Sequence, residues 1–538
     1  MTCLAWLADR LSRPRLERET ARHLAALAEG PVRVSRRTAH RLLRGLRAEP
    51  GPKVTLGETA WGEPVIVPLQ EFVRSAGIMT GGMGSGKTMA ACLTLEAIIA
   101  RLPGLHSMAF GLVDPKGELF DGALYLLARR LEALGQQARE ELLKRIVIID
   151  FSSRQAISSY NILSRWPYTE PDFFVTCRLE TLKELLPSGD KLSLRGGEVL
   201  KNVLALLAEF GLPFTYLTQV LEVEAFRWRL LAQSKNPEVK LYFSRHFAQE
   251  GKATLAALRV RMESLFASEG VRLALAGSTA PDFRRLQNEG KIVLINCAGP
   301  SITRGVRLVL QGLVLSDIRG AIFTRPNNPP VTYLWFADEA QNFFRTRKQQ
   351  EDVEDICTMG RSFGSYFCFM CQNLTSSVPD SRILEQLYTN IRWSLTLRGT
   401  PRDAQFLRAA LPVTGRHPRP DPHPFREHTF YSLEEERVLA LEGISSLPDQ
   451  TGYLWLKTRS REAIRIRTRT LPLPEGEAFR EIVEALREEP RLGGRLSRQE
   501  YERVIEERDR QWRELPEESG LPDRFEKKYR EERGAWQA

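Results

Sequence analysis

The chain has few cysteines, few histidines and no long hydrophobic run. Its 538 residues include seven cysteines, scattered and odd in number, which argues against a disulfide framework and suits a reducing cytoplasm. The seven histidines show no spacing typical of a metal site. No stretch approaches the roughly 18 consecutive apolar residues of a membrane-spanning helix, and the N-terminus does not read as a signal peptide. We therefore expect a cytoplasmic protein with no direct membrane span.

Charge is unevenly distributed along the chain, and the net charge of +10 favours a polyanionic partner. Residues 1–50 are basic and helix-prone, and the pattern from Val34 to Leu46 indicates a helix with Ser35 as its N-cap. That helix is interpreted either as the second half of a helix-turn-helix or as a surface helix with solvated arginines, and we favour the second. Residues 473–538 form a charged, helix-prone tail with few apolar anchors. We expect this tail to be partly disordered or to dock on a partner.

The segment T-G-G-M-G-S-G-K-T, Thr80 to Thr88, fits G-x-x-x-x-G-K-[ST], the phosphate-binding loop of P-loop NTPases. An apolar strand pattern precedes it and a helical pattern follows it, which is the order that this loop requires. Lys87 is expected to reach the β- and γ-phosphates of ATP, and the Thr88 hydroxyl to bind Mg²⁺. The residues expected to bind the nucleotide are Gly81, Gly82, Met83, Gly84, Ser85, Gly86, Lys87 and Thr88.

A second motif, V-T-Y-L-W-F-A-D-E-A-Q, reads as a buried strand with two acids at its carboxyl end. Asp338 is assigned to the metal, because an acid in this place can hold the hydration shell of Mg²⁺. Glu339 is assigned to the attacking water, as the base that orients and deprotonates it. The adjacent glutamate therefore predicts hydrolysis of ATP and not simple nucleotide binding.

A third segment, G-R-S-F-G-S-Y-F-C-F-M-C-Q-N, adds two candidate catalytic residues. Gln372 ends a predicted strand, where its amide can contact both the γ-phosphate and the water. Arg361 precedes the strand and is the best candidate for an arginine finger supplied to a neighbouring subunit, although an exposed arginine at a helix end is the simpler alternative.

Strand and helix patterns alternate around these motifs, which predicts an α/β fold with a mainly parallel sheet. Buried strands are indicated at 108–113, 145–151, 291–297, 332–337, 366–371 and 391–397. Amphipathic helices replace strands between 165 and 287, which predicts an inserted all-α domain. The predicted divisions are 1–50, a basic helical segment; 51–164 and 288–472, the two parts of the ATPase core; 165–287, the all-α insertion; and 473–538, the charged tail.

These motifs together resemble those of the conjugative coupling proteins of type IV secretion systems, within the FtsK/HerA superfamily of P-loop DNA translocases. The resemblance rests on G-G-M-G-S-G-K-T, V-D-P-K-G-E-L-F, W-F-A-D-E-A-Q-N-F and G-R-S-F-G, and D-P-K-G-E-L is the most family-specific of them. It implies a RecA-like core, a homo-hexameric ring with ATP at subunit interfaces, and Arg361 acting in trans. Family members commonly begin with transmembrane helices, and this chain shows no such run. We therefore expect it either to dock on a membrane-anchored secretion or relaxosome partner at the inner membrane or to work free in the cytoplasm.

The function expected from these features is ATP-driven movement of DNA, most simply in conjugative transfer. Channel arginines and lysines would contact phosphates without reading bases, and the candidates are Arg304, Arg307, Arg345, Arg347 and Lys348. One alternative is a DNA-processing pump of the HerA type. The other is a recruitment platform that passes protein cargo to a secretion channel.

Overall fold

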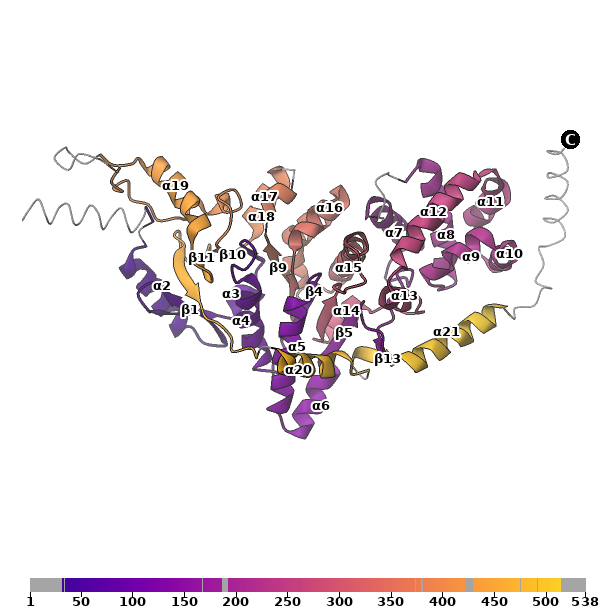
Figure 1. The fold of residues 1–538 in the computed structure, drawn as a ribbon, viewed down its shortest axis with the longest axis horizontal. Coiled ribbons are helices and arrows are strands. Elements are labelled where there is room, and N and C mark those ends of the chain that lie inside the picture. The colour runs from indigo at the N-terminus through magenta and orange to yellow at the C-terminus, as the bar shows by residue number, and fades with distance from the viewer. Residues whose placement is uncertain are drawn as a thin grey trace, which may run out of the picture. The chain divides into compact units, whose positions relative to one another are not determined.

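The computed structural model describes residues 31–513, except for 33, 167, 186–191, 373, 379–380, 421–428, 475 and 491. The chain divides into two compact units. The first unit comprises Met1–Ala97 and Cys368–Pro472, and the second comprises Ile98–Phe367 and Leu473–Ala538. Figure 1 labels many of the helices and strands of both units. No helix among the described residues is long and apolar enough to cross a membrane.

The first unit is built on a mixed sheet in the strand order β2-β1-β12-β11-β10-β3-β9. Strand β3 pairs in parallel with β10 and with β9, whose carboxyl half belongs to this unit, while the other pairs are antiparallel. The strands are β1 (Lys53–Thr59), β2 (Pro64–Pro68), β3 (Gly77–Thr80), β9 (Ser365–Cys371), β10 (Trp393–Leu397), β11 (Thr451–Leu456) and β12 (Ile464–Thr468). The Trp393 ring fills the space beside Gly77, where an added Cβ would lie 1.9 Å from the ring. Only glycine therefore fits at this start of β3.

Among the described residues, six α-helices of this unit lie before and between these strands in the chain. They are α2 (Arg36–Ala48), α3 (Gln70–Val73), α4 (Lys87–Ile99), α17 (Leu374–Ser377), α18 (Ser381–Asn390) and α19 (Leu433–Glu442). The predicted cap of α2 is present, since the Ser35 side chain accepts a hydrogen bond from the Thr38 backbone. His40 and Arg47 of α2 both contact Glu63 in the β1–β2 turn. These contacts hold the basic helix against its own sheet, as in the surface-helix interpretation.

The second unit contains four parallel strands in the order β8-β4-β7-β5. They are β4 (Met108–Asp114), β5 (Ile146–Asp150), β7 (Ile292–Asn296) and β8 (Thr332–Ala337). Every residue of these four strands is buried except the first residue of β8, as expected for a parallel sheet covered on both faces. Its flanking helices are α5 (Glu118–Glu132), α6 (Gln136–Arg145), α15 (Arg304–Phe323) and α16 (Arg347–Met359). The carboxyl ends of β4, β5 and β7 are in register, which aligns Asp114, Asp150 and Asn296.

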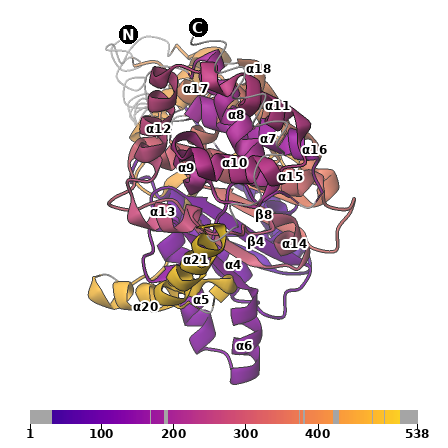
Figure 2. The same cartoon turned by 90° about the vertical axis from the view of Figure 1, so that its right-hand side faces the viewer.

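The chain between β5 and β7 is mainly helical, and Figures 1 and 2 show α7 to α12 grouped together. These helices are α7 (Pro171–Leu185), α8 (Leu194–Glu209), α9 (Leu217–Glu222), α10 (Glu224–Gln233), α11 (Pro237–Arg245), α12 (Lys252–Leu265), α13 (Glu269–Leu275) and α14 (Phe283–Asn288). A single two-residue strand, β6 (Ala156–Ile157), precedes them. The boundaries of the predicted all-α domain remain a prediction.

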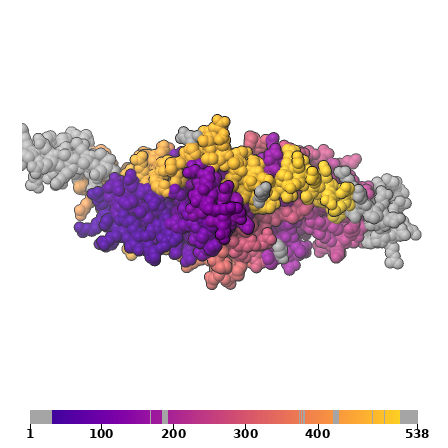
Figure 3. All heavy atoms as spheres, turned by 90° about the horizontal axis from the view of Figure 1, so that it is seen from below, coloured from indigo at the N-terminus to yellow at the C-terminus, as the bar shows by residue number. Residues whose placement is uncertain are grey.

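The C-terminal segment packs on its own unit through α20 (Glu477–Arg487) and α21 (Arg498–Arg513). Phe479 of α20 contacts Tyr125 of α5, with ring centroids 5.5 Å apart. Strand β13 (Leu496–Ser497) pairs with β6, and the Tyr501 hydroxyl donates to the Leu273 carbonyl at 2.8 Å. Figure 3 shows this segment in yellow along the surface. The tail was predicted to be partly disordered or to dock on a partner. Its described residues form α20 and α21 on this unit, docking on a partner remains a prediction, and the rest of the tail lies outside the described residues.

Candidate active site

The predicted phosphate-binding loop lies in the first unit and joins β3 to α4. Gly84 and Gly86 have φ angles of 70° and 100°, in the left-handed region that glycine occupies without strain. A Cβ at Gly81 would lie 2.5 Å from the Ser85 hydroxyl, which itself donates to the Gly82 carbonyl at 2.8 Å. The loop is thus closed tightly on itself. Its geometry requires glycine at Gly81, Gly84 and Gly86.

Lys87 begins α4 and points back under the loop. Its ammonium donates to the carbonyls of Gly81 and Gly82 at 2.6 Å and 2.9 Å, and the side chain is buried. Thr88 is half-buried in the first turn of the helix, while Met83 is exposed at the tip of the loop. A cation inside the loop and the amino end of a 13-residue helix together suit a phosphate group.

Gln372 follows β9 directly and lies at the same edge of the first unit's sheet as this loop. Thr80 is in register with Cys371, and the Gly81 amide donates to the Cys371 carbonyl at 3.2 Å. The half-buried Gln372 is therefore next to the residue that pairs with the start of the loop. The first unit thus brings together the predicted loop and the predicted glutamine.

Asp338 and Glu339 follow β8 in the second unit. The Asp338 amide donates to the Val113 carbonyl at 3.0 Å, which continues the pairing with β4, and the residue is 3% exposed. Glu339 has a φ of 47°, a left-handed conformation that is uncommon for a residue other than glycine. Such local strain is found mostly at functional positions.

The electrostatic environment of Asp338 is strongly acidic. Burial, together with the neighbouring carboxylates of Asp114 and Glu339, raises the pKa of Asp338 above its ordinary value. Burial likewise raises the pKa of Asp114, although backbone amides that bond its carboxylate act in the opposite direction. Two or three carboxylates in a buried place favour a cation there.

Lys116 is a member of this cluster that the sequence motifs did not assign. Its ammonium forms an ion pair with the Glu339 carboxylate. Burial acts to lower the pKa of Lys116, but the bond to Glu339 and the charges of Glu339 and Asp338 outweigh it, and the pKa is raised. The place of Lys116 in the D-P-K-G-E-L motif, just after β4, could have marked it as a site residue. That motif does not predict that β8 is the neighbouring strand.

Arg361 lies away from these carboxylates in the short helix η4 (Gly360–Phe363) and is exposed. The carbonyls of Ser362 and Gly364 accept hydrogen bonds from Asn328 and Tyr333, at 3.0 Å and 2.8 Å, where the chain enters β8. The arginine is therefore at the amino edge of the sheet, and the length of β8 separates it from Asp338 by about 20 Å. Within its own subunit Arg361 does not reach the carboxylates, and its action in trans remains a prediction.

The predicted channel residues are mostly engaged in local contacts. Arg347 pairs with Glu351 at 3.0 Å and Lys348 with Asp352 at 3.2 Å, both along α16. Arg345 donates to the Asn342 side chain at 3.2 Å. Burial and the nearby charge of Arg304 lower the pKa of Arg345, which places two like charges near each other.

Asp338 and its surroundings fit a magnesium ion whose remaining ligands are water and phosphate oxygens. Among the described residues, no group of three or more histidine, cysteine, aspartate or glutamate side chains is arranged to hold a metal alone. Mg²⁺ is usually bound by one or two carboxylates, with water and substrate phosphates completing its octahedron. Buried Asp338 in its acidic surroundings meets that requirement.

No protein-family model and no curated protein sequence matches the chain. Solved structures match it in fold. The plasmid coupling protein TrwB in complex with ADP and Mg²⁺ has a TM-score of 0.50 at 15% identity, over 84% of this chain and 96% of that chain. VirB4 of Thermoanaerobacter pseudethanolicus has a TM-score of 0.49 at 14% identity, over 79% and 98%. The likeness to TrwB shows the fold alone, and it confirms the predicted α/β class with a RecA-like, mainly parallel core.

Proposed function

We propose that this chain is an ATP-hydrolysing motor that acts on DNA. The observation that carries the proposal is the loop from Gly81 to Thr88, closed over Lys87 at the amino end of α4. A loop of this form binds the phosphates of a nucleotide. The similar protein TrwB has ADP and Mg²⁺ bound, which supports ATP and Mg²⁺ as the ligands of this chain.

Each predicted residue has one task in the proposed reaction. Lys87 binds the β- and γ-phosphates, and Thr88 and Asp338 hold the metal, which supplies charge neutralisation of the phosphates when bound. Glu339 orients the water and accepts its proton, and Gln372 contacts the γ-phosphate. Arg361, exposed at the far edge of β8, serves the nucleotide of a neighbouring subunit in a homo-hexamer.

Movement of DNA, most simply in conjugation, is the finer part of the proposal. It is supported by the net charge of +10, by the arginines near the carboxyl end of β8 and by the fold shared with a plasmid coupling protein. A membrane-anchored secretion or relaxosome partner would then place the motor at the inner membrane. The HerA-type pump is less favoured, because such pumps usually carry an N-terminal β-barrel and residues 36–48 form a helix.

The decisive experiment is steady-state ATP hydrolysis by the purified protein, alone and with single- or double-stranded DNA. Lys87→Ala should abolish turnover and leave the fold intact, because the loop loses its only predicted phosphate cation. Lys252→Ala is the matched control, since this lysine is exposed at the start of α12. Normal ATP turnover by Lys87→Ala would refute the assignment of this site. DNA stimulation that fades with added salt would support the DNA part.

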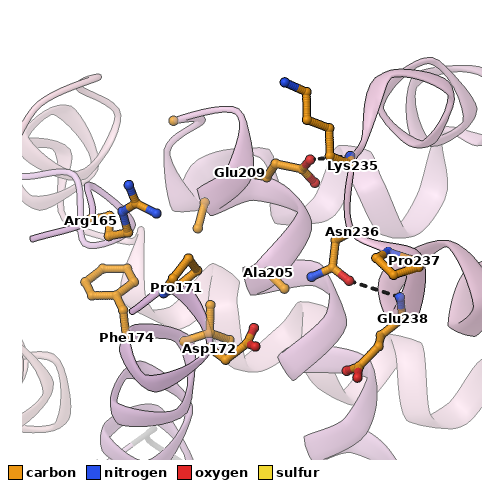
Figure 4. Close-up of a pocket in the computed structure, with 13 residues that line it drawn as sticks. Arg165, Pro171, Asp172, Phe174, Ala205, Glu209, Lys235, Asn236, Pro237 and Glu238 are labelled. Carbon is orange, nitrogen blue, oxygen red and sulfur yellow. Dashed lines mark hydrogen bonds between the residues drawn. The ribbon is translucent and has the colours of Figure 1, made fainter. Parts of the chain in front are cut away.

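The recruitment platform remains the second candidate because the helical segment contains a cavity of about 770 Å³. Figure 4 shows Arg165, Pro171 and Phe174 on one side and Asn236 and Pro237 on the other. Its size and mixed apolar and charged lining are within the range of ligand pockets, which suits a short peptide segment of cargo. ATP turnover that is indifferent to DNA would favour this candidate over the DNA motor.

A further inference from the structure

Both carboxylate oxygens of Glu339 are engaged by side chains of its own unit. Lys116 contacts Oε1, and the Gln341 amide donates to Oε2. These two donors fix the orientation of the carboxylate, so that it cannot turn toward a bound water molecule without losing one of them. The residue proposed as the base is therefore held by two side-chain donors, Lys116 and Gln341. We call this the guarded arrangement, and Lys116 its guard.

We propose that Lys116 is a positioning residue that holds Glu339 in this guarded arrangement until a phosphate oxygen draws the lysine ammonium away. This inference rests on the proposed function, because it describes how the same site is regulated. The class of ligand is a phosphate oxyanion, and the source that the basic character of the chain favours is the DNA backbone. Free phosphate or the nucleotide itself would present the same chemistry.

The backbone beneath Lys116 is fixed. The Asp114 carboxylate accepts hydrogen bonds from the amides of Lys116 and Phe120, at 2.7 Å and 2.9 Å. Gly117, with a φ of 91°, then makes the turn into α5. The turn therefore keeps the Cα of Lys116 in place while its four-carbon side chain is free to move between two partners.

Exposure makes the exchange possible at this ion pair. The Lys116 side chain is 35% exposed, whereas the Glu339 side chain is 11% exposed. An anion arriving from solvent can thus reach the lysine without first reaching the glutamate. Phosphate oxygens compete well for an ammonium, since the lysine acts as a point charge toward them.

The backbone of Glu339 is in a conformation that is uncommon for a residue other than glycine. The residue is in the left-handed region, with φ 47° and ψ 43°, directly before the short helix η3 (Ala340–Phe344). Asn342 of that helix bonds Gln311 of α15, and Arg345 after it bonds Asn342. A phosphate bound near Arg345 would therefore pull on the segment that carries Glu339.

The test compares wild type, Lys116→Ala, the charge-retaining Lys116→Arg and the control Lys252→Ala in ATP hydrolysis. Lys116→Ala should raise ATP turnover in the absence of DNA by about tenfold, within the range that coupled sites commonly show. It should also bring the ratio of turnover with and without DNA close to one. Lys116→Arg should retain much of the ratio, and Lys252→Ala all of it. Lower turnover of Lys116→Ala in both conditions would overturn the proposal, because it would show that Lys116 supports catalysis.

The source of the phosphate is decided by adding a single-stranded oligonucleotide or inorganic phosphate to wild type and to Lys116→Ala. Stimulation of wild type by the oligonucleotide alone, absent in the variant, assigns the DNA backbone. Stimulation of wild-type ATP turnover by inorganic phosphate identifies free phosphate as the ligand, and the proposed role of Lys116 is retained. If wild type and Lys116→Ala respond equally to both, the guard is overturned.

A second measurement separates failure of this inference from failure of the proposed function. Urea unfolding of Lys116→Ala, Glu339→Gln and the double variant gives the coupling between the two side chains without any ATP. A coupling of about fivefold in the unfolding equilibrium constant is expected for this partly buried pair. Coupling without any ATP hydrolysis by wild type would refute the function and retain the ion pair. Hydrolysis without coupling would refute the guard and retain the function.

Discussion

Replacing Asp317 by asparagine should destabilise the second unit strongly. Asp317 lies on α15 and is 5% exposed, and it forms an ion pair with Arg178 of α7, which is 1% exposed. The Tyr160 hydroxyl donates to Asp317 at 2.5 Å and the Trp166 indole at 2.6 Å. One carboxylate thus receives three donors that come from α7 and from the chain after β5.

The size of the effect follows from the charge left behind. In Asp317→Asn the Arg178 guanidinium remains buried among Trp166 and Phe174, whose rings lie 5.1 Å and 4.9 Å away, and has no counter-charge. Removing one partner of a buried pair costs about 3–5 kcal/mol. Since folded proteins are stable by about 5–15 kcal/mol, about a fifth or more of the stability would be lost. At about 2–4 °C per kcal/mol, Tm should fall by roughly 10 °C.

The assay is thermal and urea unfolding of wild type and two variants in the same buffer. Glu222→Gln is the matched control, because Glu222 pairs with Arg259 at 3.0 Å and both side chains are more than 40% exposed. The same change from carboxylate to amide should cost less than about 1 kcal/mol at that exposed pair. The double variant Arg178→Met with Asp317→Leu should recover much of the loss, since an apolar replacement of a buried pair is often neutral. If Asp317→Asn costs no more than Glu222→Gln, the reasoning from burial is refuted.

Two further predictions concern a pH dependence and an arginine. Burial raises the pKa of Asp121 to about 6, outweighing the nearby Arg487, so this group stabilises the fold at low pH and the contribution is lost as pH rises from about 4 through 6. Asp121→Asn should remove that loss and raise stability at pH 7 by about 2–3 kcal/mol, and a Tm-against-pH curve identical to wild type would contradict it. Arg361→Ala should bind nucleotide but lose turnover, and mixing it with Glu339→Gln subunits should restore some activity. Mixed rings as inactive as either variant would count against action in trans.

The strands and the motifs at their ends were predictable from local patterns. Residues 332–337 were predicted as a strand and form β8, and 108–113 forms all but the last residue of β4, because buried parallel strands are continuous apolar runs. The phosphate-binding loop was predictable since its glycines are required by its geometry.

Contacts that depend on strand order were not predictable. Lys116 and Glu339 are far apart in the sequence, and they meet because β4 is the neighbour of β8 in the sheet. The packing of α20 was also missed, because its few apolar residues find partners only after folding, as Phe479 does on Tyr125 of α5. Local composition alone favoured disorder there.

The carboxyl edge of the second unit's sheet explains why Asp338 is the strongest candidate for the metal. Asp150 is already committed, since it accepts from Arg487 at 2.6 Å and from Asn296 at 2.9 Å. Asp114 is committed as well, because it bonds the amides that begin α5. Burial, together with the charges of Asp114 and Glu339, raises the pKa of Asp338, as expected for a carboxylate whose surroundings provide too little positive charge. A divalent cation would supply that charge.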